Sequence, residues 1–286
     1  MMGPAYKVEL PHVAAACVVF ASPHSGRDYT RRFLGASVLD SHTIRSSEDA
    51  FVDQLFSAAP EFGAPLLCAT APRAFVDLNR APDEFDGALV TGVRNNAHNP
   101  RVASGLGVIP RVVSNGRAIY RGKMSKAEAE ARIAQYWHPY HDKLRSLLTA
   151  ARSEFGRAIL VDCHSMPHEA LDGVAKVGMR RPDIVLGDRF GSTASADVVD
   201  RIESAFKSAG FAVARNAPFA GAYITQAYGR PSLHQHAVQI EIDRSIYMDE
   251  RAIRPNSQFE DVRLRLRRVI AEVTEIGKSR MPLAAE

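Results

Sequence analysis

Short runs of apolar and β-branched residues alternate along the chain with longer segments of helical periodicity. Several of the short runs are apolar throughout, which is typical of strands covered on both faces. The predicted strands are residues 17–22, 66–70, 74–78, 108–113, 158–162, 184–186, 211–215 and 237–242. This alternation predicts a three-layer α/β fold with a mixed or mostly parallel sheet.

The longer segments predict four helices. They are residues 49–59, 125–153, 194–209 and 258–278. Ser125 with Glu128 forms a capping-box signal at the start of the longest one. The stretch 82–104 contains Gly, Asn and Pro without periodicity, so we expect a long loop there, a candidate lid. Because no linker or repeat divides the chain, we expect a single catalytic domain over residues 1–286.

The composition is that of a soluble globular chain, with 46% hydrophobic and 24% charged residues among 286. The net charge of +4 is spread along the chain, and no Lys/Arg run alternates with aromatic residues. We therefore expect no nucleic-acid partner, while a site for a small anion fits. The apolar run 13–21 is too short to span a bilayer, and Glu9 before it is atypical of a secretory leader, so we expect no membrane association.

Cysteine usage indicates a reducing compartment. Cys17, Cys68 and Cys163 are odd in number, and each lies inside an apolar segment. We interpret them as small thiols packed in strands, which is typical of a cytoplasmic protein. Three scattered cysteines exclude a zinc-finger type of site, so a metal here would need histidine and carboxylate ligands.

Two histidines directly follow predicted strands. His24 lies in Ser-Pro-His-Ser-Gly at 22–26, and His164 lies in Cys-His-Ser-Met-Pro at 163–167. Ligands of open α/β sheets collect at the carboxyl ends of strands, where these turns are expected. Two neutral imidazoles with one carboxylate leave zinc an open coordination position, as in a catalytic site. The alternative is that each ring is a structural hydrogen-bonding group.

Glu48 and Asp49 are the candidates for the third ligand. They begin the predicted helix 49–59, and positions 48 and 49 both share a buried face with the apolar residues at 52, 55 and 56. The alternative is that both acids cap the helix and complement its dipole. We favour Asp49 as a ligand and keep Glu48 as its alternate.

Glu241 lies among apolar neighbours in the predicted strand 237–242. Strand alternation places Gln239, Glu241 and Asp243 on one face and the apolar residues on the other. A carboxylate that faces a dry cleft can act as general base and then as general acid. The alternative is a solvated face of an edge strand.

Asn79 and Arg80 form a candidate clamp for a substrate carboxylate, because a guanidinium binds a carboxylate in bidentate fashion. Arg73 and Arg230 are similar substrate-binding candidates, and we expect Arg230 to close over the site from the turn before Glu241. The alternative is an internal ion pair with Asp77 or Asp243.

A thiol enzyme that uses Cys163 is a further alternative, since His164 is adjacent. Neighbouring residues of a strand face opposite ways, which argues against it. The chain contains no G-x-S-x-G elbow, no phosphate-binding loop of the Walker type and no G-x-G-x-x-G fingerprint.

These candidate residues lie in motifs whose order resembles that of the N-formylglutamate amidohydrolase family. The likeness covers about residues 14–270 and is carried by the motifs at 22–26, 47–53, 72–80, 105–111, 162–167, 183–189 and 239–244. The resemblance implies a zinc-carboxypeptidase-like (phosphorylase/hydrolase-like) fold with a central mixed sheet of about eight strands.

The resemblance also implies roles for individual residues. His24, His164 and an acid at 48 or 49 match the zinc ligands, and Glu241 matches the general base. Asn79 with Arg80 matches the clamp for the substrate carboxylate. One departure is that carboxypeptidases have the ligand acid three residues after the first histidine, where this chain has Arg27.

From this resemblance we expect one zinc ion per chain and hydrolysis of N-formyl-L-glutamate to L-glutamate and formate. The substrate would be a small N-acyl acidic amino acid, and the reaction would belong to histidine catabolism in the cytoplasm. The alternatives are an amidase or deacylase for another N-acylated acidic amino acid, and a non-catalytic relative that binds a metal or an anion. The sequence leaves the oligomeric state open, and a homo-oligomer is compatible with it.

Overall fold

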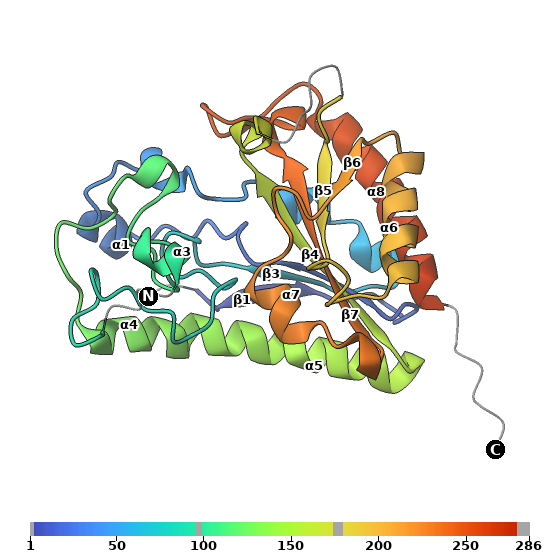
Figure 1. Cartoon of the computed structure of the whole chain (residues 1–286), viewed down its shortest axis with the longest axis horizontal. Coiled ribbons are helices and arrows are strands. Elements are labelled where there is room, and N and C mark those ends of the chain that lie inside the picture. Colours follow the sequence, from blue (N-terminus) through green and yellow to red (C-terminus); the bar gives the residue numbers. More distant parts are fainter. Residues whose placement is uncertain (1–2, 95–98, 174–179, 279–286) are drawn as a thin grey trace. The chain divides into compact units, whose positions relative to one another are not determined.

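The computed structural model of the chain describes residues 3–94, 99–173 and 180–278 (Figure 1). The strands are β1 (Tyr6–Glu9), β2 (Val18–Ser22), β3 (Leu66–Ala69), β4 (Ala158–Met166), β5 (Ile184–Gly187), β6 (Val213–Arg215), β7 (Gln235–Asp243), β8 (Met248–Asp249) and β9 (Arg254–Pro255). The α-helices are α1 (Arg31–Ala36), α2 (Val52–Leu55), α3 (Pro100–Ala103), α4 (Lys126–Arg132), α5 (His138–Phe155), α6 (Ala196–Ser208), α7 (Tyr223–Tyr228) and α8 (Phe259–Lys278).

A central sheet of seven strands dominates the described structure, in the order β1-β3-β2-β4-β7-β5-β6. β4 pairs in parallel with β2 and with β7, and β5 pairs in parallel with β6. The pairing of β5 with β7 is antiparallel, so the sheet is mixed and mostly parallel. The prediction of the α/β class with such a sheet is confirmed, with seven strands where about eight were expected.

Five of the seven strands of the central sheet form the core because they are buried along nearly their whole length. All residues of β2, β3, β4 and β5 are buried, as are those of β7 after Gln235. Helices α6 and α8 pack against each other and against this sheet (Figure 1). Uninterrupted burial is the physical reason for the continuous apolar runs in the sequence.

By its internal contacts the chain divides into two compact units. One comprises residues 1–7, 23–50 and 68–143, and the other residues 8–22, 51–67 and 144–286. β4 to β9 belong to the second unit, whereas α1, α3 and α4 belong to the first. The chain passes between the units several times, so neither unit is one continuous stretch of sequence.

Two predicted strands are wrong. Residues 74–78 form a turn, in which the amide groups of Phe75 and Val76 both donate to the carbonyl of Pro72. Residues 108–113 contribute only an isolated bridge at Val112. Both segments are apolar because they are buried, and burial alone does not create a strand. The short edge strand β1 was not predicted, since its residues alternate between half-buried and exposed.

The helix predicted over 49–59 is also wrong in extent. α2 begins only at Val52 because Phe51 has a positive φ of 68°, which a helix cannot contain. Residues Ala59–Phe62 form a separate 3₁₀ turn. The predicted helix 125–153 is confirmed, with a π-helical segment at Ile133–Trp137 between α4 and α5.

The predicted loop 82–104 contains the short helix α3, and its residues 95–98 lie outside the described part of the chain. Asn99 caps α3 by accepting from the amide groups of Arg101 and Val102. Among the described helices, none is both long and apolar enough to cross a membrane.

Candidate active site

Four polar side chains meet on one face of β4 and β7, near the carboxyl ends of these parallel strands. The strand register pairs Asp162 with Gln239 and His164 with Glu241. Directly paired residues of neighbouring strands project from the same face of a sheet. All four side chains are buried, so they form a polar cluster inside an otherwise apolar core. The predicted placement of Gln239 and Glu241 on one face is confirmed.

Asp162 contacts the ring of His164. Its Oδ2 lies 3.0 Å from His164 Nε2, and the carboxylate is completely buried. Neither oxygen of Asp162 has a well-aligned hydrogen bond among the described residues. A buried carboxylate beside an imidazole orients the ring and turns its other nitrogen outward, as in carboxylate–histidine–metal arrangements.

His24 lies two residues beyond the end of β2. The turn that carries it packs closely on the neighbouring chain, since a Cβ at Gly26 would lie 2.1 Å from the carbonyl oxygen of Ala71. Only glycine tolerates such an approach. The ring is buried, with Nε2 at 2.7 Å from Asp77 Oδ1 and Nδ1 at 3.4 Å from Asp49 Oδ2. Nδ1 is therefore the nitrogen that faces the second carboxylate.

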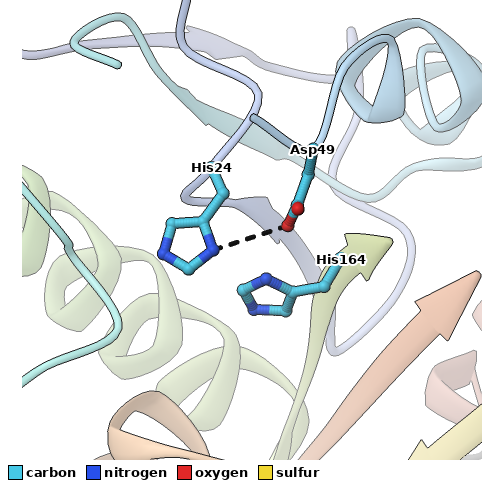
Figure 2. Close-up of side chains that lie close together, drawn as sticks. All are labelled: His24, Asp49 and His164. Carbon is cyan, nitrogen blue, oxygen red and sulfur yellow. Dashed lines mark ion pairs between the residues drawn. The ribbon is translucent and has the colours of Figure 1, made fainter. Parts of the chain in front are cut away.

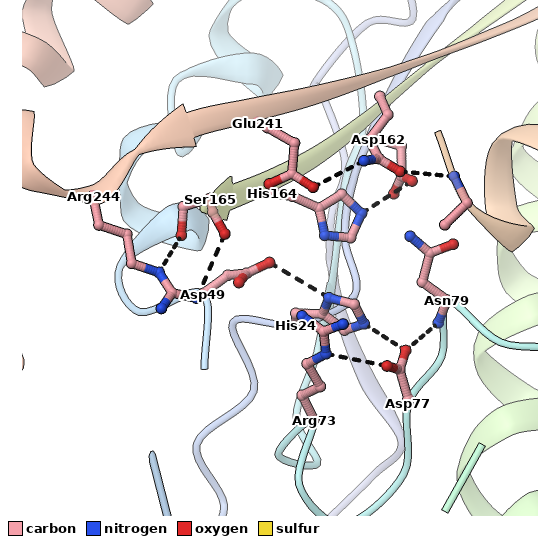
Figure 3. A network of polar contacts seen from close by, with 12 residues as sticks. His24, Asp49, Arg73, Asp77, Asn79, Asp162, His164, Ser165, Glu241 and Arg244 are labelled. Atoms are coloured by element: carbon pink, nitrogen blue, oxygen red, sulfur yellow. Dashed lines mark hydrogen bonds and ion pairs between the residues drawn. The ribbon is translucent and has the colours of Figure 1, made fainter. Parts of the chain in front are cut away.

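Asp77 is the hub of the contacts around His24 (Figure 3). It accepts from His24 Nε2, from the amide of Asn79 at 2.8 Å and from Arg73 Nε at 3.1 Å. Burial opposes ionisation of Asp77, but the Arg73 charge and the His24 contact hold the pKa of its carboxyl well below the usual value. A permanently ionised Asp77 fixes the orientation of the His24 ring.

The structure separates the two acids at 48 and 49. The amide group of Asp49 donates to the carbonyl of His24 at 3.0 Å, which directs its side chain toward that ring. Glu48 instead accepts from Arg45 Nε and Nη2, at 2.9 and 3.0 Å, and from the hydroxyl of Tyr29 at 3.1 Å. Burial, and then the negative charge of Glu48, raise the pKa of Tyr29 well above its usual value, so the phenol stays a donor.

His24, Asp49 and His164 come together as one group (Figure 2). Each offers one ligand atom, and these atoms all lie within 4.8 Å of one another, with all three side chains buried. Two imidazoles and a carboxylate form a donor set that suits a divalent transition metal such as zinc. These three residues could therefore hold a metal ion.

Asn79 and Arg80 lie in a turn that side chains of the π-helical segment and of α5 hold in place. Trp137 Nε1 donates to the carbonyl of Arg80 at 2.9 Å, and the His141 ring donates to the carbonyl of Leu78 at 2.9 Å. The Arg80 side chain is buried, and its Nε has no hydrogen-bond partner among the described residues. Burial, and then the charges of Arg101 and Arg73, lower the pKa of Arg80 against the opposing influence of Asp77. An acceptor brought by a ligand would satisfy this guanidinium.

The other two candidate arginines lie in different places. Arg73 is partly exposed and pairs with Asp77. Arg230 is exposed, donates to the carbonyls of Gln226 and Gly229, and pairs with Gln235 at the start of β7. The start of this strand lies about 20 Å from Glu241, at about 3.3 Å per residue. The expectation that Arg230 closes over the site is therefore corrected.

Four buried residues near the site were not among the predicted site residues, although Asp77 was considered as an ion-pair partner. They are Asp77, Asp162, Gln239 and Arg244. Arg244 Nε donates to Ser165 Oγ at 3.2 Å, next to His164 (Figure 3). Spacing of two residues from a candidate (162 from 164, 239 from 241, 77 from 79) could have found three of them, because such residues share a face of a strand or close one turn.

The chain is similar to known proteins along most of its length. The family model described as N-formylglutamate amidohydrolase matches residues 16–248. An N-formylglutamate deformylase of Pseudomonas aeruginosa is 32% identical over 90% of this chain and 91% of its own length. A second N-formylglutamate deformylase, of Pseudomonas putida, is 29% identical over 84% of each chain.

A solved structure shows the same similarity in three dimensions. The crystal structure of the N-formylglutamate amidohydrolase from Ralstonia eutropha JMP134 matches 96% of this chain and 98% of its own, with a TM-score of 0.89 and 33% identity. Sequence and fold thus agree over nearly the whole chain. The chain belongs to the N-formylglutamate amidohydrolase family and is a hydrolytic enzyme.

Proposed function

We propose that this protein is a zinc-dependent amidohydrolase that cleaves N-formyl-L-glutamate to L-glutamate and formate. The observation that carries the proposal is the convergence of His24, Asp49 and His164 within 4.8 Å in a member of this family. The names of the two Pseudomonas relatives support the substrate.

His24 and His164 would bind zinc through Nδ1, because Nε2 of each ring faces a buried aspartate. Asp49 would supply the third ligand, and the contacts of Arg45 and Tyr29 with the oxygens of Glu48 support this choice over Glu48. When bound, zinc polarises the scissile carbonyl and makes a water molecule acidic near neutral pH.

Glu241 would be the general base. Its carboxylate is buried on the same sheet face as His164 and in register with it. It would take a proton from the attacking water and deliver it to the amide nitrogen as the C–N bond breaks. Glutamate then leaves with a free amino group, and the formyl carbon leaves as formate.

Asn79 and Arg80 would bind one carboxylate of the substrate. The unpartnered Arg80 Nε and the shared positive field of Arg73 and Arg101 favour an anion there. Asp77 accepts from Arg73 and from the amide of Asn79, so it holds both in place without engaging the Arg80 Nε.

We extend the proposal to the biological setting. Cys17, Cys68 and Cys163 are buried thiols outside disulfide bonds, which supports a reducing compartment such as the cytoplasm. The reaction would serve histidine catabolism there, and the interleaved order of the two compact units supports treating 1–286 as one catalytic domain.

The test is zinc content together with formate release from N-formylglutamate, for the wild type and for His164→Ala. We expect about one zinc per chain in the wild type and loss of both zinc and turnover in the variant. His42→Ala is the matched control, because it removes an exposed imidazole outside the group. Turnover in His164→Ala without zinc would contradict the proposal, and turnover only on a larger acyl group would change the substrate.

A further inference from the structure

We propose that Gln239 is a positioning residue that fixes the carboxylate of Glu241, an inference that rests on the proposed role of Glu241 as general base. Gln239 Nε2 donates to Glu241 Oε1 at 2.8 Å, and both side chains are buried. The amide group of Ala222 donates to Gln239 Oε1 at 3.1 Å. The three groups form a short series of hydrogen bonds that ends on Glu241.

The chemistry of these groups determines which atom donates and which accepts in each hydrogen bond. A backbone N–H can only donate, so the side of the Gln239 amide that faces Ala222 must be its oxygen. The NH₂ group then faces Glu241, and Glu241 Oε1 must be an acceptor. We therefore assign proton uptake in the reaction to Oε2, the oxygen that does not accept from Gln239.

The fold holds Gln239 from the neighbouring strand. Gly187 of β5 pairs with Gln239 of β7, and residues 220–221 cross directly over this glycine. A Cβ at Gly187 would lie 2.7 Å from the carbonyl carbon of Ala220 and from the amide nitrogen of Gly221. Because glycine allows this close crossing, the next residue, Ala222, brings its amide group to Gln239.

A glutamine suits this position better than a charged or an apolar residue. An apolar side chain would leave the Ala222 amide and a carboxylate oxygen without partners in a buried place. A glutamate would place a second carboxylate beside Glu241. The amide is neutral, accepts on one side and donates on the other, so it aligns Glu241 without adding charge.

The first test is Gln239→Met, which keeps the shape and removes both hydrogen bonds. We expect kcat to fall by about 10- to 100-fold, the range for a lost hydrogen bond to a charged group. KM and zinc content should stay within about twofold of the wild type, since Gln239 contacts neither the grouped ligands nor the Arg80 turn. Gln239→Glu should lose at least as much activity.

The matched control is Gln235→Met in the same strand. Gln235 Nε2 donates to the carbonyl of Tyr228 at 2.7 Å, at the far end of β7. This control removes a side-chain hydrogen bond from β7 without touching Glu241, so its kcat should be that of the wild type. An equal loss of kcat in both variants, or none in Gln239→Met, would overturn the inference.

A double-mutant cycle with Glu241→Gln separates positioning from a general structural effect. In the Glu241→Gln background, Gln239→Met should reduce the residual kcat no further, because the group to be positioned is gone. A full, additive loss would mean that Gln239 acts independently of Glu241.

A spectroscopic readout keeps the inference separate from the proposed function. The side-chain NH₂ signals of Gln239, assigned by their absence in Gln239→Met, should shift clearly in Glu241→Ala and stay unchanged in the remote His42→Ala. Unchanged signals in Glu241→Ala would overturn the inference. If the wild type fails to release formate while these signals do shift, the proposed function fails and the contact stands.

Discussion

Buried carboxylates hold the two histidines of the group. Asp77 contacts Nε2 of His24 at 2.7 Å, and Asp162 contacts Nε2 of His164 at 3.0 Å. In both cases Nε2 contacts the aspartate, so Nδ1 is the nitrogen of each ring that remains for a metal ion. Replacing such a carboxylate beside a metal ligand typically lowers the affinity for the metal by about 10- to 100-fold.

Replacing Asp77 by Asn should weaken zinc binding by about 10- to 100-fold, because the His24 ring loses its charged partner. A competition titration with a zinc chelator measures this directly. Asp86→Asn is the control, since Asp86 is also buried and paired with an arginine, Arg111, but contacts no histidine of the group. Equal affinity in the Asp77 and Asp86 variants would contradict the role of Asp77.

The pair Glu48 and Asp49 gives a second prediction at this scale. Asp49→Asn should abolish stoichiometric zinc binding, whereas Glu48→Gln should retain it. Glu48→Gln weakens the contacts with Arg45 and Tyr29, so the free energy of unfolding should fall by about 1–2 kcal/mol. The thermal unfolding temperature of this variant should therefore fall by several degrees. Zinc loss in Glu48→Gln together with retention in Asp49→Asn would reverse the assignment.

At the scale of the element, period-two alternation was the most reliable guide to the site. It placed Gln239 and Glu241 on one face of β7, and the structure joins them by a hydrogen bond. The acid at 49 was harder to interpret, because the predicted helix does not begin there and Phe51 turns the chain with a positive φ. A backbone conformation set by tertiary packing leaves no pattern in the sequence.

The start of β7 carries a prediction about pH. His236 is buried, and its Nδ1 accepts from the amide group of Ser195 at 3.2 Å at the start of α6. Burial lowers the pKa of His236 below its usual value of 6.5, with Asp197 opposing and Arg157 and His234 adding to this shift. The unfolded chain therefore binds this proton more readily than the folded chain, so stability present above about pH 6.5 is lost as the pH falls.

Thermal unfolding at about pH 7.5 and pH 5.5 checks this linkage. His236→Asn keeps an acceptor for Ser195 but cannot titrate, so its unfolding temperature should fall less on acidification than that of the wild type. His12→Asn, at an exposed histidine that is not among the groups acting on His236, is the control and should behave as the wild type. If the unfolding temperature of the wild type fell on acidification only as much as that of His236→Asn, the link between His236 and stability would be refuted.

At the scale of the whole molecule, the fold class and the grouping of two histidines were predictable because they follow from strand order and strand ends. His24 follows β2, and His164 lies near the carboxyl end of the adjacent parallel strand β4, so their convergence needs only the topology. The predicted strand at 158–162 was too short, because β4 runs on through His164 to Met166. The wrong placement of Arg230 has the opposite cause. Proximity in sequence to Glu241 says nothing about which end of a nine-residue strand a turn occupies.

The segments between strands were the least predictable part. Residues 74–78 look like a strand in sequence, yet their buried turn carries Asp77 and leads into Asn79 and Arg80. Trp137 and His141 from another part of the chain hold this turn. Contacts between distant segments decide such a conformation, and no local pattern records them.

The most direct test of the central claim is anomalous X-ray diffraction at the zinc edge from crystals of the zinc-loaded protein. We predict one strong peak, bonded at about 2 Å to His24, Asp49 and His164. A peak bound elsewhere, or no peak at these three side chains under stoichiometric zinc, would contradict the account.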